Sequence, residues 1–274
     1  MLEKVEEIFK HPEIILQHIP WVDIENSMIY IGGSVMEGFG NATSDIDVFV
    51  ISSDDPTSED INLSNEEQRF FEGMYSLVHN IIHEGIRYDF TYWNSDKVNH
   101  IKNSINNIDL NTDFQMVLNK GEIDFLHRLK YAKSIINHAE FSEFLKTINF
   151  DNLRYYIAVT ESQAFAGTLE DLQGAFISKD YGTAFFRAKR LVEITFTALL
   201  ALHGETNPNV KWLYRKLQRL SETTGDFNYF SKFMELQNSN FDPATVKIYI
   251  RECVKYCQEI NIGIQEQLKT KQEV

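Results

Sequence analysis

The sequence is poor in cysteine, proline and basic residues. Its 274 residues include two cysteines and five prolines, and 26 lysines and arginines face 40 aspartates and glutamates, for a net charge of −14. Cys253 and Cys257 stand one helical turn apart and by themselves make neither a disulfide framework nor a zinc cluster. So few prolines exclude a collagen-like or proline-rich chain. The shortage of basic residues argues against general nucleic-acid binding, and so against a templated polymerase.

Long hydrophobic runs are also lacking. No apolar stretch approaches the ~18 residues of a membrane span, and no basic N-terminal region precedes an apolar run. We therefore expect a cytoplasmic protein without a membrane partner. The chain does have the means to build a core, because 43% of its residues are hydrophobic and 13% are aromatic. Its length fits one large domain or two modest ones.

The spacing of apolar residues changes along the chain. Residues 28–32 and 45–52 are typical of buried strands, and residues 86–93 alternate as a third strand. Residues 70–82 have helical spacing and follow a capping box at Ser64 and Glu67. From about residue 150 onward helical periodicity dominates, which is typical of an antiparallel bundle.

This pattern predicts an α+β protein of two domains. Residues 1–140 are expected to form a small domain with a mixed β-sheet and flanking helices. Residues 141–274 are expected to form an all-α helical bundle.

A glycine turn follows the first predicted strand. In Gly32-Gly33-Ser34 the absence of side chains lets backbone N–H groups approach a phosphate, and the serine adds a hydroxyl donor. A helix beginning at Ser34 would also direct its positive end at that anion. By itself Gly-Gly-Ser is more often a simple turn.

Two aspartates open the second predicted strand. Ten residues separate Ser34 from Asp45, and Asp45 and Asp47 share one face of the strand because side chains alternate. Adjacent carboxylates repel each other unless a cation lies between them, and their hard oxygens suit Mg²⁺. The alternative is a pair of solvated aspartates at the mouth of a strand.

A third aspartate lies in the third predicted strand. Asp89 shares a face with Arg87 and Thr91. If this strand lies beside the second, Asp89 completes a cluster of three carboxylates able to hold two metal ions for in-line attack on a nucleotide phosphate. The alternative is a surface ion pair with Arg87.

The order of these features resembles the signature of the DNA polymerase β-like nucleotidyltransferase superfamily. The residues that carry the resemblance are Gly33, Ser34, Asp45, Asp47 and Asp89. The resemblance covers residues 28–93, and the loop of residues 38–44 also fits the pattern, so Ser44 joins the expected nucleotide-binding residues. It implies Mg²⁺-dependent transfer of a nucleoside monophosphate from a nucleoside triphosphate, with ATP expected, to an acceptor, with release of pyrophosphate.

The helical second half is similar to that of bacterial antibiotic nucleotidyltransferases, such as the kanamycin and streptomycin/spectinomycin adenylyltransferases. There a basic residue of the helical domain reaches the triphosphate, and Lys211 is the best match. An ordinary surface lysine explains Lys211 equally well, and Arg187, Lys189 and Arg190 leave the same two interpretations. Residues 127–130 also carry cations, a pattern more typical of a solvated helix face.

The resemblance gives each candidate residue a role. Asp45 and Asp47 hold the metal ions, Gly33 and Ser34 bind the outer phosphates, and Asp89 completes the metal site or takes the proton of the acceptor hydroxyl. The acidic charge favours a small, polar, positively charged acceptor such as an aminoglycoside. Two alternatives stay open: an antitoxin-type enzyme that transfers AMP to a protein, and a non-catalytic nucleotide-binding module.

Overall fold

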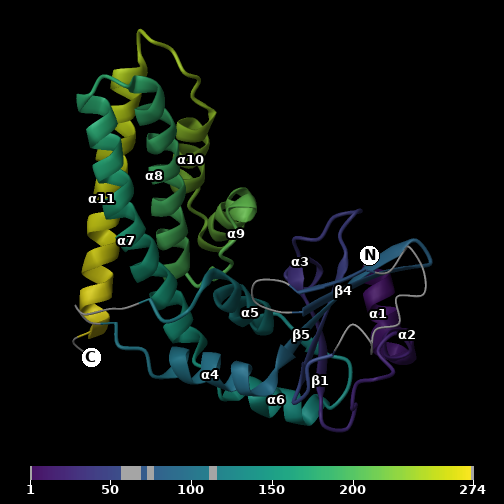
Figure 1. Cartoon of the computed structure of the whole chain (residues 1–274). Coiled ribbons are helices and arrows are strands. Elements are labelled where there is room, and N and C mark those ends of the chain that lie inside the picture. The colour runs from purple at the N-terminus through teal and green to yellow at the C-terminus, as the bar shows by residue number, and fades with distance from the viewer. Residues whose placement is uncertain (1, 57–68, 73–76, 111–115, 273–274) are drawn as a thin grey trace. The chain divides into compact units, whose positions relative to one another are not determined.

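The computed structural model describes residues 2–56, 69–72, 77–110 and 116–272. The chain divides into two compact units (Figure 1). The first comprises Met1–Asn107 and Val117–Phe150, and the second comprises Ile108–Met116 and Asp151–Val274. The domain boundary expected at residue 140 falls inside helix α6 (His138–Lys146), whose Phe141 ring stacks on Tyr30 of the first unit at 5.0 Å between ring centroids.

A six-stranded mixed sheet forms the centre of the first unit, in the order β3-β4-β5-β2-β1-β6. Its strands are β1 (Met28–Gly32), β2 (Ile46–Ser52), β3 (Arg69–Glu72), β4 (Leu77–His83), β5 (Ile86–Asn94) and β6 (Lys133–Ser134). Strands β2 and β5 run parallel, and the other neighbouring pairs are antiparallel. The predicted α+β class is confirmed.

Helices cover both faces of this sheet. They are α1 (Leu2–Lys10), α2 (Glu13–Leu16), α3 (Gly33–Met36), α4 (Ser95–Asn106), α5 (Lys120–Lys130) and α6. Ile8 of α1 and Ile15 of α2 share a fully buried core with Val48 of β2. On the opposite face, Trp93 of β5 packs against Phe125 of α5, with 4.4 Å between ring centroids. Because Val48 points into the α1–α2 core, its neighbours Asp47 and Phe49 face the α5 side.

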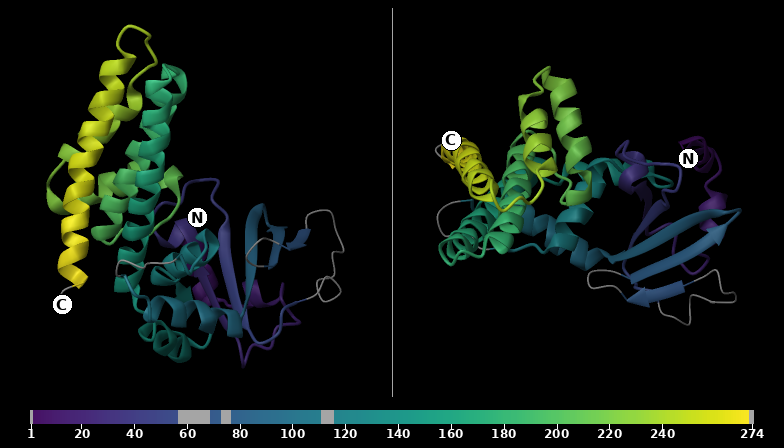
Figure 2. Two further views of the ribbon diagram at one scale, coloured as in Figure 1. Left: turned by 60° about the vertical axis from the view of Figure 1, so that its left-hand side comes forward. Right: turned by 90° about the horizontal axis from the view of Figure 1, so that it is seen from above.

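The second unit is a helical bundle, as expected. Its helices are α7 (Phe150–Ile177), α8 (Tyr181–Leu202), α9 (Leu213–Thr224), α10 (Asn228–Asn238) and α11 (Val246–Gln272), with a 3-10 turn at Val210–Trp212. Figure 2 shows α7, α8 and α11 as long helices lying alongside one another. Within the described parts of the chain, no helix has the length and apolar composition to cross a membrane.

The helix predicted over residues 70–82 is wrong, because the described residues of this stretch belong to β3 and β4. Strand β4 pairs with β5 along its whole length, and Ile81 lies opposite the buried Tyr88. The apolar spacing of these residues fits a helix and a strand equally well, and pairing with the long apolar strand β5 selects the strand. The predicted capping box at Ser64 and Glu67 lies outside the described residues.

Strand β4 also places a histidine in the core. His79 is only 2% exposed and packs between Trp21 and Phe90, with ring centroids 5.9 and 5.7 Å away. Neither ring nitrogen has a hydrogen-bond partner among the described residues. Burial, with a smaller contribution from His18, lowers the pKa of His79 to about 4.

We expect this histidine to make the protein less stable in mild acid. Its pKa is about 6.5 in an unfolded chain, so between that pH and about 4 the unfolded state binds the extra proton, and stability falls as the pH drops through this window. The loss approaches about 3 kcal/mol at pH 4. His79→Phe keeps an aromatic ring in the core and should flatten this pH dependence in urea unfolding between pH 7.5 and pH 4.5. Equal slopes for the two proteins would contradict the assignment.

Candidate active site

The parallel pairing of β2 with β5 brings the acidic residues together. Asp47 of β2 lies directly opposite Asp89 of β5, so their side chains share the sheet face that looks toward α5. Asp45 immediately precedes β2 and by alternation belongs to the same face. The three carboxylates therefore gather at one end of two neighbouring strands.

The glycine turn lies against the second of these carboxylates. Gly32 at the end of β1 pairs with Asp47, and Gly33 follows with a φ of +74°. A Cβ on Gly33 would collide with Asp47 Oδ2 and lie 2.6 Å from its Cγ. A side chain at position 33 is thus excluded both by the backbone conformation and by the space that the carboxylate occupies.

The two predicted serines differ in their surroundings. Ser34 is half-buried in the short helix α3, directly after Gly33. Ser44 lies in a turn before Asp45, where its hydroxyl accepts a hydrogen bond from the Asn41 N–H at 2.8 Å. Ser34 therefore adjoins the carboxylates through Gly33, whereas the hydroxyl of Ser44 is engaged within its own loop.

Arg128 of α5 holds the Asp47 carboxylate. Its Nη1 donates to Asp47 Oδ1 at 2.9 Å, and its Nε donates to Asp124 Oδ2 at 2.6 Å. Burial raises the pKa of Asp47 despite this contact. Burial also acts to lower the pKa of Arg128, but the two carboxylates together outweigh it and hold that pKa above its usual range. Because Asp47 shares the Arg128 guanidinium with Asp124, this contact only partly offsets the cost of burying the Asp47 charge.

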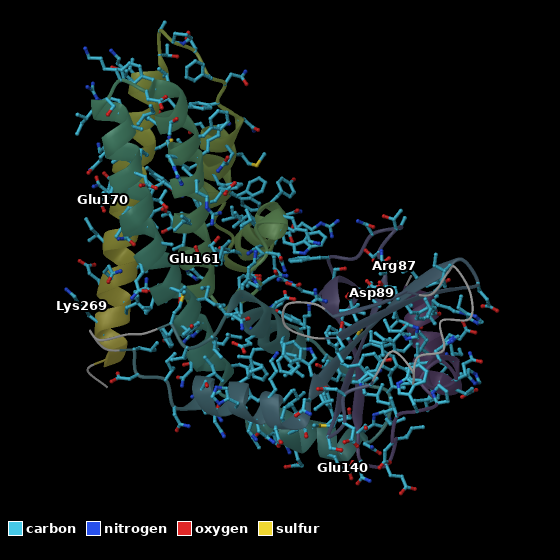
Figure 3. All side chains as sticks on the ribbon, viewed as in Figure 1. Arg87, Asp89, Glu140, Glu161, Glu170 and Lys269 are labelled. Carbon is cyan, nitrogen blue, oxygen red and sulfur yellow. The ribbon has the colours of Figure 1, made fainter. Side chains whose placement is uncertain are left out.

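Arg87 of β5 joins the other two carboxylates; Arg87 and Asp89 are labelled in Figure 3. Its Nε and Nη2 donate to the two oxygens of Asp89 at 2.8 and 3.1 Å, and its Nη1 lies 3.7 Å from Asp45 Oδ2. Asn80 of β4 adds a third hydrogen bond to Asp89, at 2.6 Å. Even so, burial is the largest influence on Asp89 and raises its pKa. The ion pair between Arg87 and Asp89, given above as the alternative to a carboxylate cluster, is present together with that cluster.

A buried contact between His127 and Glu37 joins α5 to the residue that follows α3. His127 Nε2 lies 3.1 Å from Glu37 Oε2, and both side chains are almost completely buried. The solvated face expected for residues 127–130 is therefore wrong for His127 and Arg128. Glu37 and Asp47 precede these two residues by about 80 residues or more, so no local pattern in the sequence indicates either contact. The only local signal is the spacing of Asp124 and Arg128 by one helical turn.

The chemistry of these side chains fits magnesium. The described residues contain no ready-made group of three or more histidine, cysteine, aspartate or glutamate side chains that could hold a metal ion. Mg²⁺ needs no such cage, because it binds through one or two carboxylates together with substrate phosphates. Asp47 Oδ2 accepts no hydrogen bond from the described residues and occupies the space that a side chain at position 33 would fill. Asp45 is partly exposed, so its carboxylate oxygens are accessible to a cation.

The predicted basic residues belong to the helical unit. Lys211 lies in the turn Val210–Trp212, with its Nζ 5.0 Å from the centroid of the Trp212 ring. Arg187 pairs with Asp171, Arg190 pairs with Glu193, and Lys189 donates to the Gln237 carbonyl. A role of Lys211 in nucleotide binding stays a prediction.

One part of the chain matches a known protein family. Residues 8–105 match the family described as "Nucleotidyltransferase domain", and this segment includes β1, β2, β5 and all three aspartates. A nucleotidyltransferase-like protein from Exiguobacterium sibiricum is similar in structure, with a TM-score of 0.46 and 11% identity over 96% of this chain and 75% of that one. No curated protein matches the sequence. The family match confirms the expected enzyme class, a nucleotidyltransferase.

Proposed function

Because residues 8–105 match a nucleotidyltransferase domain, we propose that this protein transfers AMP from ATP to a hydroxyl group of a small polar acceptor, with Mg²⁺. The observation that carries the proposal is the gathering of Asp45, Asp47 and Asp89 beside the Gly33 turn. An enzyme for this reaction must hold a nucleotide and a divalent cation at one point, and these residues offer both contacts.

Each residue has a definite task in this reaction. Asp45 and Asp47 would hold Mg²⁺, which neutralises charge on the phosphates when it is bound. The Gly33 turn and the Ser34 hydroxyl bind the β- and γ-phosphates, and Ser44 is a further nucleotide contact. The acceptor oxygen bonds to the α-phosphorus while the bond to pyrophosphate breaks.

Asp89 has two possible tasks, and Arg87 bears on both. It either completes the metal site or takes the proton that the acceptor hydroxyl loses. Arg87 donates to both oxygens of Asp89, so it competes with a metal ion or a proton for the same lone pairs. Asp89 therefore becomes fully available only where Arg87 shifts toward Asp45 or toward a bound phosphate.

For the acceptor we propose a cation such as an aminoglycoside. The net charge of −14 attracts cations over a range of about 8–10 Å at moderate ionic strength. Acceptor kcat/KM should then fall as salt is added, more steeply than the affinity for ATP. An efficient neutral or anionic acceptor would reject this choice and leave the nucleotidyl transfer proposal intact.

Pyrophosphate release tests the reaction. The purified chain is incubated with each of the four nucleoside triphosphates and an aminoglycoside panel, with Mg²⁺ or with EDTA. Release that needs ATP, Mg²⁺ and an aminoglycoside together, with an adenylylated product in mass spectrometry, supports the proposal. Label on a protein would instead assign protein adenylylation, and no release with any nucleotide and acceptor would overturn the proposal.

Ser34→Ala should weaken ATP binding more than AMP binding. The hydroxyl lost is the one assigned to the outer phosphates, which AMP lacks, and a hydrogen bond to a charged group is worth about 1.5–3 kcal/mol. We therefore expect about a tenfold or greater loss of ATP affinity in calorimetry with Mg²⁺ and little change for AMP. Ser53→Ala, at an exposed position after β2, is the control. Equal losses for ATP and AMP would remove Ser34 from the phosphate site.

A further inference from the structure

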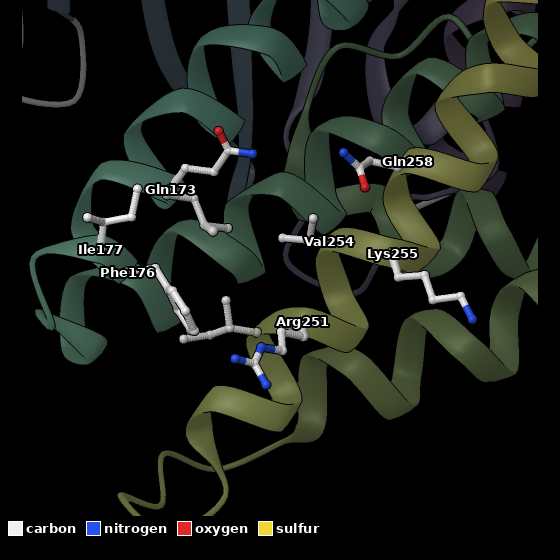
Figure 4. Close-up of a pocket in the computed structure, with 9 residues that line it drawn as sticks. Gln173, Phe176, Ile177, Arg251, Val254, Lys255 and Gln258 are labelled. Atoms are coloured by element: carbon white, nitrogen blue, oxygen red, sulfur yellow. The ribbon is translucent and has the colours of Figure 1, made fainter.

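An open apolar groove lies between α7 and α11 in the helical unit (Figure 4). Its volume is about 440 Å³. Leu172 of α7 and Ile250 of α11 line it and are almost completely buried, while Ile177 at its edge is 79% exposed. A groove of this size, mostly apolar and carrying a few polar groups, has the character of a small-molecule site, for which volumes are about 300–1,000 Å³.

The groove is positively charged in an acidic protein. Arg251 and Lys255 line it, and none of its lining residues is acidic. Lys247 precedes Arg251 by one helical turn. Most arginines of the described chain pair with a carboxylate, as Arg187 does with Asp171. Within the described residues Arg251 has no such partner, and its guanidinium lies 5.6 Å from the centroid of the Phe176 ring.

The two lysines, Lys247 and Lys255, also lack a close carboxylate partner in the part of the chain that the structure describes. Lys247 lies 4.7 Å from the centroid of the Tyr181 ring and has no carboxylate partner among the described residues. Lys255 reaches Glu259 only at 4.0 Å, in an exposed pair that contributes little. In Figure 4 the Lys255 ammonium points away from the groove, whereas Arg251 lies beside Phe176. Arg251 is therefore the cation best placed to meet a ligand in the groove.

We propose that this groove binds a small amphiphilic anion, an apolar chain that ends in a carboxylate. The chain would lie on Leu172 and Ile250, and the carboxylate would meet Arg251 in a charge-assisted hydrogen bond. From Ile250 to Gln258 the groove follows about 12 Å of α11. That length suits an extended chain of about ten carbons and is short for a partner helix of three or four turns. The site is separate from the nucleotidyl transfer proposal and does not depend on it.

Two ligands of opposite charge test this assignment. Isothermal titration calorimetry of the full chain compares decanoate with decyltrimethylammonium, both below their critical micelle concentrations. A net charge of −14 by itself favours the cation, so tighter binding of decanoate isolates the local effect of the groove. Octanoate, two methylenes shorter, should bind about tenfold more weakly than decanoate.

Variants locate the binding. Arg251→Gln should weaken decanoate binding about tenfold or more, and Ile177→Asp should also weaken it, while Lys269→Gln, at an exposed position farther along α11, should not. Far-UV circular dichroism checks the fold of each variant. Asp47→Asn should bind decanoate normally, which separates this proposal from the catalytic one. The proposal is overturned if decanoate does not bind, if Arg251→Gln binds it unchanged, or if an acidic amphipathic peptide binds here and decanoate does not displace it.

Discussion

Asp47→Asn is expected to lower the rate of nucleotidyl transfer by about a thousandfold or more while the fold stays intact. The exchange keeps the shape of the side chain and removes the negative charge of the oxygen that faces Gly33. A Mg²⁺ ion held by one or two carboxylates cannot replace that charge, and stabilisation of a transferring phosphate depends on the ion. Initial rates of pyrophosphate release measure the loss.

The metal-free variant gives a second measurement. Burial raises the pKa of Asp47, so the ionised form costs more free energy in the folded protein than in the unfolded chain. Arg128 keeps Asp124 as a partner when the side chain at position 47 carries no charge. The melting temperature in EDTA should therefore rise. Mg²⁺ together with ATP should raise it further in the wild type and much less in Asp47→Asn.

A neighbouring aspartate serves as the matched control. Asp124→Asn also removes a carboxylate from Arg128, but it leaves Asp45, Asp47 and Asp89 in place. Its effect on the rate should stay below about tenfold, as expected for a group outside the three-aspartate cluster that contacts Arg128. Near-normal turnover of Asp47→Asn, or an equally large loss in Asp124→Asn, would remove Asp47 from the metal site.

The fold could be predicted where the sequence pattern is local. Strand β1 covers the predicted residues 28–32, and β2 and β5 differ from their predicted ranges by one residue each, since a run of apolar residues ended by glycine or an alternating run has few other solutions. Residues 77–83 had no such signal. Their apolar side chains fit a helix and a strand equally, and only pairing with β5 decides between the two.

The site divides in the same way. Asp45, Asp47 and Asp89 follow from a spacing within strands, and the remaining requirement, that β2 and β5 are neighbours, is met by their parallel pairing. The guanidinium groups do not follow from spacing. Arg128 meets Asp47 across 81 residues of sequence, and no local pattern predicts which helix face will cover the end of a strand. The pairing of these carboxylates with distant arginines is thus the part of the site that the sequence alone could not predict.

Gly33→Ala is expected to damage both stability and activity. Gly33 has a φ of +74°, where an alanine costs about 1–2 kcal/mol, and the added Cβ collides with the Asp47 carboxylate. Relieving such a collision adds about 1–3 kcal/mol, so we expect a total loss of about 3 kcal/mol in urea unfolding. Because the carboxylate or the turn must shift, the transfer rate should fall by about a hundredfold or more, since a displacement of 1 Å at a reacting centre has effects of this size.

Gly38→Ala separates the two causes. Gly38 lies just after α3 with a φ of +81°, but a Cβ there meets nothing within 4 Å. This variant therefore has only the conformational cost of about 1–2 kcal/mol and should keep most of the activity. The difference between the two variants then measures the contact between position 33 and Asp47. If Gly38→Ala lost as much activity as Gly33→Ala, the loss would come from the loop conformation, and the close approach of Gly33 to Asp47 would have no part in catalysis.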